Sequence, residues 1–88
     1  RPMTAEEAYS RLLKVVSMTF DWKTLPDGYT LFVGEYHADT YRNFKGEWNW
    51  YAFKGNEMIG SGKGLKDSSV SRAAAEKCIL EHLKQEKP

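Results

Sequence analysis

Cysteine and long apolar runs are scarce in this sequence of 88 residues. The one cysteine, Cys78, excludes an internal disulfide, which argues against a disulfide-stapled secreted scaffold and favours a reducing, intracellular compartment. No segment approaches the roughly 18 apolar residues that span a bilayer, and none resembles a signal peptide, so no membrane partner is expected. The net charge of +1 provides no overall basic field, so any binding of nucleic acid must come from a local patch.

Aromatic residues, in contrast, are plentiful: three tryptophans, five tyrosines and four phenylalanines. Hydrophobic residues make up 41% and charged residues 28% of the chain, a balance typical of a folded globular protein. We expect one domain over residues 1–88, with flexible ends at residues 1–3 and 84–88.

The N-terminal segment predicts an amphipathic helix over residues 4–20. Thr4 followed by Glu7 has the spacing of a capping box. Apolar residues then recur every four positions, at Ala8, Leu12, Val16 and Phe20. Pro26 and Gly28 predict a turn after this helix.

Three strands are expected in the middle of the chain. Residues 29–36 are β-branched and aromatic, and residues 48–53 alternate as a strand does. Residues 37–47 are polar and predict a longish loop or a frayed hairpin end. Residues 54–56 predict a tight turn, and residues 57–61 predict a short third strand.

A second helix is expected to begin at Ser68 or Ser69, either of which can serve as its N-cap. Its apolar residues form a narrow face of mostly small side chains suited to close packing on a sheet: Val70, Ala74, Ala75, Cys78 and Ile79. The predicted fold is therefore α+β, in the order helix, three strands, helix (α-β-β-β-α). The three-stranded antiparallel sheet should carry both helices on one face.

Gly60, Gly62 and Gly64 precede this helix, where glycines often cradle phosphate. A P-loop needs another glycine five positions before Gly62-Lys63, but Glu57 stands there, and the spacing also fails as a dinucleotide fingerprint. The glycines could equally serve a positive φ or a close helix–sheet approach. No metal-ligand spacing or nucleophile–base pattern is present in the sequence, so no catalytic residue, metal or cofactor is expected, and no enzyme.

The C-terminal third of the chain resembles the double-stranded RNA-binding domain (dsRBD). The glycines match the family's G-x-G-x-G, the small residues of the last helix match its alanine-rich positions, and the order of elements is the same. The resemblance is degenerate in the lysine motif, because the family's lysine pair falls on Asp67 and Ser68.

The resemblance implies that the partner is an A-form RNA duplex, recognised by its shape through phosphate and 2′-hydroxyl contacts. One group of implied contacts lies at the glycines and the helix start: Lys63, Lys66, Ser68 and Arg72. A second group would reach the next groove from the strand loop: His37, Arg42 and Lys45.

Two other functions remain open. A module of the same fold could bind a protein partner or form a homodimer through outward aromatics, namely Tyr41, Phe44, Tyr51 and Phe53. A small sheet-and-helix protein could instead read a DNA major groove with its strands, through Arg42, Lys45, Asn49 and Lys54.

Overall fold

The structure is a computed structural model that describes residues 2–18 and 20–86, but not the side chains of residues 13 and 15–18. Val16, one of the apolar positions expected in the first helix, therefore lies outside the described side chains. The elements in chain order are α1 (Ala5–Met18), β1 (Lys23–Leu25), β2 (Gly28–Val33), β3 (Tyr36–Arg42), β4 (Trp48–Lys54), β5 (Glu57–Leu65) and α2 (Ser68–Gln85). α2 thus includes two residues of the predicted C-terminal flexible end.

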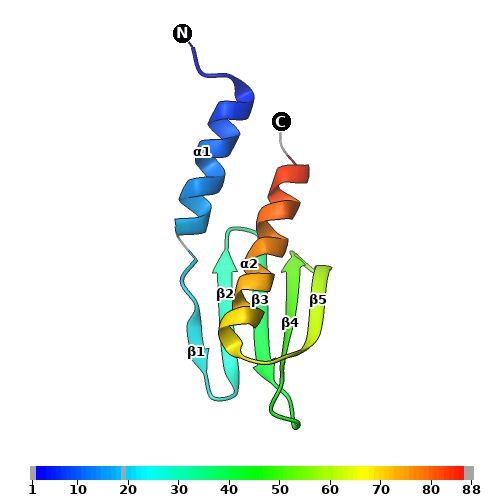
Figure 1. The fold of residues 1–88 in the computed structure, drawn as a ribbon. Coiled ribbons are helices and arrows are strands. Elements are labelled where there is room, and N and C mark those ends of the chain that lie inside the picture. The colour runs from blue at the N-terminus through cyan, green and yellow to red at the C-terminus, as the bar shows by residue number, and fades with distance from the viewer. Residues whose placement is uncertain (1, 19, 87–88) are drawn as a thin grey trace.

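The strands form one antiparallel meander in the order β1-β2-β3-β4-β5 (Figure 1). The α+β class is confirmed, whereas the prediction of three strands is wrong, because the sheet has five. The tight turn after β4 is confirmed at Gly55, whose φ of 58° favours glycine. The predicted strand over residues 29–36 is instead interrupted by a turn at Gly34, and β3 begins at Tyr36.

The two missed strands carry little of the apolar alternation that identifies strands. In β3, predicted to be a loop, Ala38 and Thr40 face α2 and are fully buried, while His37 and Asp39 face away. The buried positions are small or hydroxylated because the helix packs closely above them. β1 has three residues and pairs with β2 across the predicted turn at Pro26. The turn therefore joins the two strands of a short hairpin, whose first strand was not predicted.

The predicted glycine loop is also a strand, since β5 runs from Glu57 through Leu65. A Cβ added at Gly62 would lie 2.2 Å from Nε1 of Trp50, and one at Gly60 would lie 2.5 Å from Sγ of Cys78 on α2. The absence of a side chain at Gly62 therefore lets the Trp50 indole pack against β5, and its absence at Gly60 lets α2 pack against the same strand. The sequence left open whether the glycines provide a positive φ or a close helix–sheet approach. At Gly60 and Gly62 the structure shows the close approach, and neither has a positive φ.

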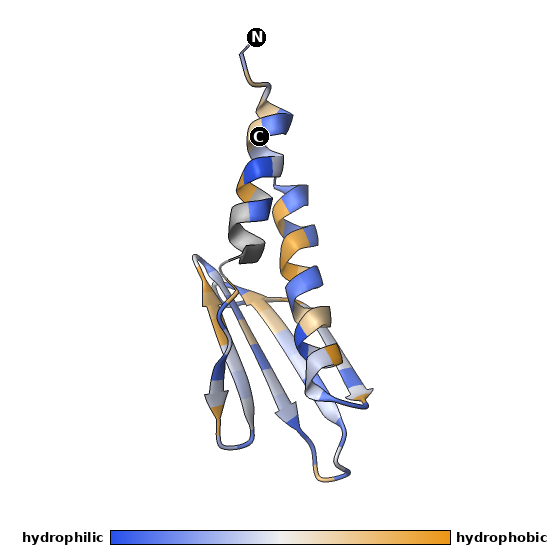
Figure 2. Cartoon of the chain, turned by 60° about the vertical axis from the view of Figure 1, so that its left-hand side comes forward, coloured by the Kyte–Doolittle hydropathy of each residue, from blue (hydrophilic) through white to orange (hydrophobic). Residues whose placement is uncertain are grey.

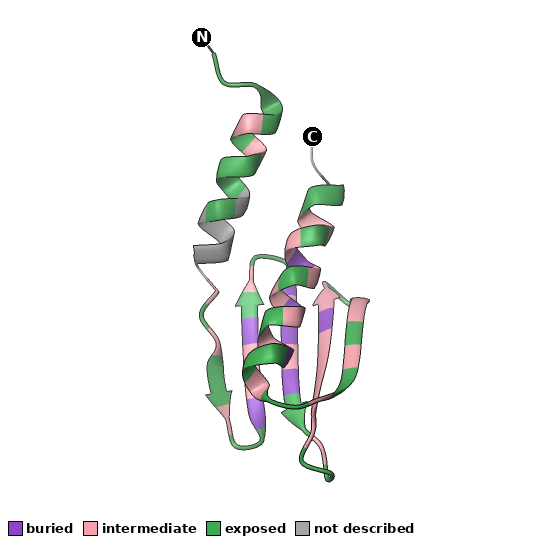
Figure 3. Ribbon diagram, viewed as in Figure 1, coloured by how far each residue is buried: buried purple, intermediate pink, exposed green. Residues whose placement is uncertain are grey.

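The core lies between α2 and the middle strands, as the burial colouring in Figure 3 shows. Its buried members are Leu31, Tyr36, Ala38, Ala52, Ala75 and Ile79. The predicted buried face of α2 is wrong at Val70, which is 49% exposed, while the next residue, Ser71, is fully buried. Ser71 pairs with Thr40 through their hydroxyl groups, and Thr40 Oγ1 donates to the Asn49 carbonyl at 2.9 Å, so neither buried hydroxyl lacks a partner.

α1 begins as the capping box predicts, since the Glu7 N–H donates to Thr4 Oγ1 at 3.1 Å. It packs against α2 and extends beyond the sheet, as Figures 1 and 2 show, so the prediction that both helices cover the sheet is wrong. Phe20 and Trp22, which follow α1, pack against the core, and the Trp22 indole donates to Glu76 of α2 at 2.7 Å. None of the described helices has the length and apolar character to span a bilayer.

Candidate nucleic-acid interface

Six of the seven predicted contact residues come from chain segments that meet at one end of the sheet. Arg42 pairs with Trp48, and Trp48 pairs with Leu65, so the end of β3, the start of β4 and the end of β5 are neighbours. The β3–β4 turn and the segment from β5 to α2 extend from this row (Figure 1). We call this region the basic end: Arg42, Lys45, Lys63, Lys66, Ser68 and Arg72.

The basic end concentrates positive charge that the whole chain does not show. Residues 42–47 and 63–72 contain five basic and two acidic residues, a net charge of +3, against +1 for the chain. Asp27, whose carbonyl accepts the Arg42 N–H at 3.1 Å, lies in the adjoining β1–β2 turn and reduces the local charge to +2. The positive charge is thus confined to a local patch, which is the only form a basic surface can take in a chain of net charge +1.

The five cations of the basic end lie outside the ion pairs of the described residues, although the charge of Arg72 helps to lower the pKa of Asp67. In the described part of the chain, none of its five basic side chains forms an ion pair, and all of them except Arg72 are exposed. Elsewhere Lys54 pairs with Glu86, and Lys77 lies 3.9 Å from Glu81. A cation outside an ion pair attracts phosphate without first having to separate from a carboxylate.

Asp67 is the N-cap of α2. Its carboxylate accepts the Val70 N–H at 3.0 Å and the Ser69 hydroxyl at 2.6 Å, and these hydrogen bonds lower the pKa of Asp67, the Ser69 contact most. The prediction that Ser68 or Ser69 caps the helix is wrong, because Ser68 is the first helical residue. The carboxylate occupies the helix N-terminus, where a phosphate would otherwise be favoured.

Arg72 is held against the sheet. Its guanidinium carbon lies 4.5 Å from the centroid of the Tyr29 ring, and its Nε donates to the Ser68 carbonyl at 3.2 Å. These contacts fix the direction of the side chain. Arg72 is accordingly half-buried, while Lys63 and Lys66 are exposed, so the two lysines are the more accessible cations.

Asn43 fixes the shape of the β3–β4 turn. Its side-chain oxygen accepts the N–H groups of Lys45 at 2.9 Å and of Glu47 at 3.0 Å. Its carbonyl accepts the Gly46 N–H at 3.0 Å, and Gly46 has a φ of 82°, which disfavours other residues. The turn thereby holds Arg42 and Lys45 near the rest of the basic end.

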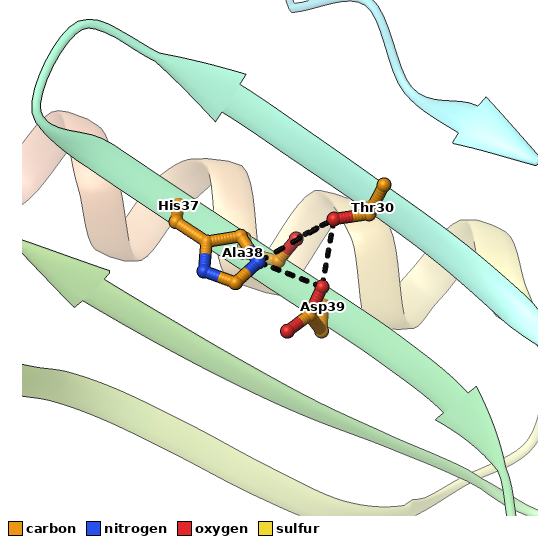
Figure 4. A network of polar contacts seen from close by, with 4 residues as sticks. All are labelled: Thr30, His37, Ala38 and Asp39. Carbon is orange, nitrogen blue, oxygen red and sulfur yellow. Dashed lines mark hydrogen bonds and ion pairs between the residues drawn. The ribbon is translucent and has the colours of Figure 1, made fainter.

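His37 is the predicted contact that the fold places elsewhere. It pairs with Phe53 near the opposite end of β3, five residues from Arg42, or about 17 Å along an extended strand. Its Nε2 lies 2.9 Å from Asp39 Oδ1 and 3.4 Å from Thr30 Oγ1, and Thr30 donates to Asp39 at 2.7 Å (Figure 4). His37 therefore stands outside the basic end.

The cluster of Thr30, His37 and Asp39 does not have the geometry of a catalytic triad. In a triad the nucleophile and the acid contact opposite nitrogens of the imidazole. Here both oxygens approach the same nitrogen, Nε2, and the Thr30 hydroxyl also lies within hydrogen-bond distance of Asp39 Oδ1 and of the Ala38 carbonyl (Figure 4). Among the described residues, no group of three or more His, Cys, Asp or Glu side chains is placed to hold a metal ion.

The sheet face opposite α2 carries a row of stacked rings that the sequence analysis did not identify as a unit. His37 lies between Phe32 and Phe53, with ring centroids 4.6 Å and 5.7 Å away. Phe32 is 68% exposed. Strand alternation would have revealed the row had residues 36–42 been interpreted as a strand, because His37 and Phe53 are cross-strand partners.

The residues expected to read DNA bases are largely engaged within the protein. Lys54 is in its ion pair with Glu86. The Asn49 side-chain oxygen accepts the Gly64 N–H at 3.1 Å and lies 3.4 Å from the Asn43 amide nitrogen. Arg42 and Lys45 remain, and both belong to the basic end.

Comparison of the chain with protein families, with curated protein sequences and with solved structures finds no match. The dsRBD resemblance stays a prediction.

Proposed function

We propose that the protein is a non-catalytic module that binds double-stranded RNA through its basic end. The observation that carries the proposal is the position of cations from two separate parts of the chain at one end of the sheet. Arg42 ends β3 and Lys45 lies in the β3–β4 turn, while Lys63 lies near the end of β5 and Lys66 follows that strand. Two sets of cations on a rigid frame suit the recognition of a duplex by its backbone.

The choice of RNA rests on the resemblance to the dsRBD and on the form of the surface. The β3–β4 turn projects from the end of the sheet, and the segment between β5 and α2 crosses the strands to reach the start of the helix (Figure 1). The wide minor groove and narrow major groove of an A-form duplex offer phosphates and 2′-hydroxyl groups to segments that project from a surface, with little sequence preference. His37 has no part in this contact.

Lys63→Glu combined with Lys66→Glu should weaken binding to a 20-base-pair RNA duplex and flatten its salt dependence. Loss of two phosphate contacts lowers the slope of log Kobs against log salt by about two units. Fluorescence anisotropy over a series of salt concentrations measures both quantities, and a DNA duplex of the same sequence tests whether RNA is preferred.

The matched control is Lys77→Glu combined with Lys84→Glu, which makes the same change in net charge on exposed positions of α2 away from the basic end. It should leave the slope unchanged. Equal weakening by both double variants would show a nonspecific charge effect and contradict the proposed site. Absence of binding to RNA at low salt would contradict the function itself.

Asp67→Asn should tighten RNA binding about two- to threefold at low salt, because it removes a negative charge beside Lys66. Asn caps a helix about as well as Asp, so α2 should keep its stability. Anisotropy titrations measure the affinity, and thermal unfolding checks the helix. Glu81→Gln removes the same charge on the far half of α2 and should change nothing; tightening by Glu81→Gln to the same degree would argue against a local effect.

A further inference from the structure

Phe44 is the least buried large hydrophobic residue of the described chain. Its side chain is 95% exposed at the tip of the β3–β4 turn, where it contributes nothing to the core. The turn does not need an aromatic residue, because most residue types are tolerated at this position of a four-residue turn. An exposed ring here has no structural reason within the chain.

The ring is presented on a rigid support. The three hydrogen bonds that Asn43 accepts, from Lys45, Gly46 and Glu47, fix the backbone on either side of Phe44. The Asn43 N–H donates to the Glu47 carbonyl at 2.7 Å and closes the turn. A ligand that stacks on Phe44 therefore pays little to order the turn.

One cation lies close to the ring, and others lie at the same end of the sheet. The Lys45 ammonium lies 5.9 Å from the centroid of Phe44, and Arg42 stands at the base of the same turn. Lys63, near the end of β5, and Lys66, directly after that strand, belong to the same end of the sheet. An exposed aromatic ring flanked by cations suits a nucleobase with its phosphates, since the base stacks and the cations hold the backbone. An apolar protein pocket would gain nothing from the flanking cations.

We propose that Phe44 stacks on an unpaired base, so that the preferred ligand is an RNA duplex with a bulged nucleotide rather than a continuous duplex. This inference rests on the proposed function and specifies the ligand of the same site. Inside a continuous duplex each base face is covered by its neighbours, and only bulges, loops and ends expose one. The cations hold the helical arms while the ring takes the extruded base.

The test compares a continuous RNA duplex with the same duplex carrying one extra adenosine in its centre. The protein should bind the bulged duplex about tenfold more tightly, a difference typical of one stacked base. Phe44→Ala should remove this difference, and Phe44→Trp should retain it. Phe32→Ala, at the second most exposed phenylalanine, on the sheet face, should also retain it. With 2-aminopurine as the bulged base, binding should quench its fluorescence, and Phe44→Ala should abolish the quenching.

The outcomes separate this inference from the proposed function. If both duplexes bind with equal affinity, or if Phe44→Ala keeps the preference, the inference fails and the basic end remains a duplex site. If neither RNA binds, the proposed function fails with it. A preference for the bulged form that is equally strong in the matched DNA pair supports stacking by Phe44 and removes the selectivity for RNA.

Discussion

Ile79→Ala is expected to lower the free energy of unfolding by about 3–4 kcal/mol, within the range measured when large aliphatic side chains are truncated in cores. Ile79 is fully buried where α2 meets the sheet. The buried residues around it include Ala38, Ala52 and Ala75, whose short side chains cannot extend into the space that the truncation leaves. Since small domains have a total stability of about 5–15 kcal/mol, the loss should be large on that scale. Urea denaturation followed by circular dichroism measures it.

Val70→Ala is the control on the same helix. Val70 is 49% exposed, so its truncation should change the free energy of unfolding by no more than about 0.5 kcal/mol. The sequence pattern alone assigns both residues to one buried face, and the structure separates them. Similar losses in the two variants would contradict the orientation of α2.

Gly28→Ala is expected to cost about 3 kcal/mol, at the upper end for a side chain forced into a packed site. A Cβ at Gly28 would lie 2.0 Å from the Thr40 carbonyl oxygen and 3.1 Å from the Tyr41 Cα. Both atoms belong to the backbone of β3, so relief of the overlap requires β2 and β3 to separate. The unfolding midpoint in urea should fall accordingly.

Gly34→Ala isolates the effect of contact from that of backbone conformation. Gly34 has a φ of 56° and no other residue's atom within 4 Å of the added Cβ, so alanine there meets only the strain of the left-handed region, about 1 kcal/mol. If Gly28→Ala costs no more than Gly34→Ala, the close approach of β2 and β3 is contradicted.

The residues of the candidate site could be proposed from the sequence, but their positions relative to one another could not. The sequence pointed to the five basic residues and the serine of the basic end, because lysines beside a turn or a helix start can be recognised from their neighbours in the chain. It also placed His37 with Arg42 and Lys45 in one contact group on the strand loop expected over residues 37–47. β3 is a strand instead, and its extended backbone carries His37 away from Arg42.

The sequence by itself determined the features that depend on neighbouring residues. These are the capping box of α1, the turn at Gly55, the strand at Trp48–Lys54 and the existence of α2, each set by local hydrogen bonding or side-chain alternation.

Only the tertiary structure decided which surfaces these elements share. The role of Gly60 and Gly62 depends on Trp50 and Cys78, which lie far along the chain. The number of strands depends on pairing that polar β3 obtains from β2 and β4. The position of α1 depends on Phe20 and Trp22, which pack against the core after the helix ends. Contacts between distant segments are settled by packing in three dimensions, and no local pattern encodes them.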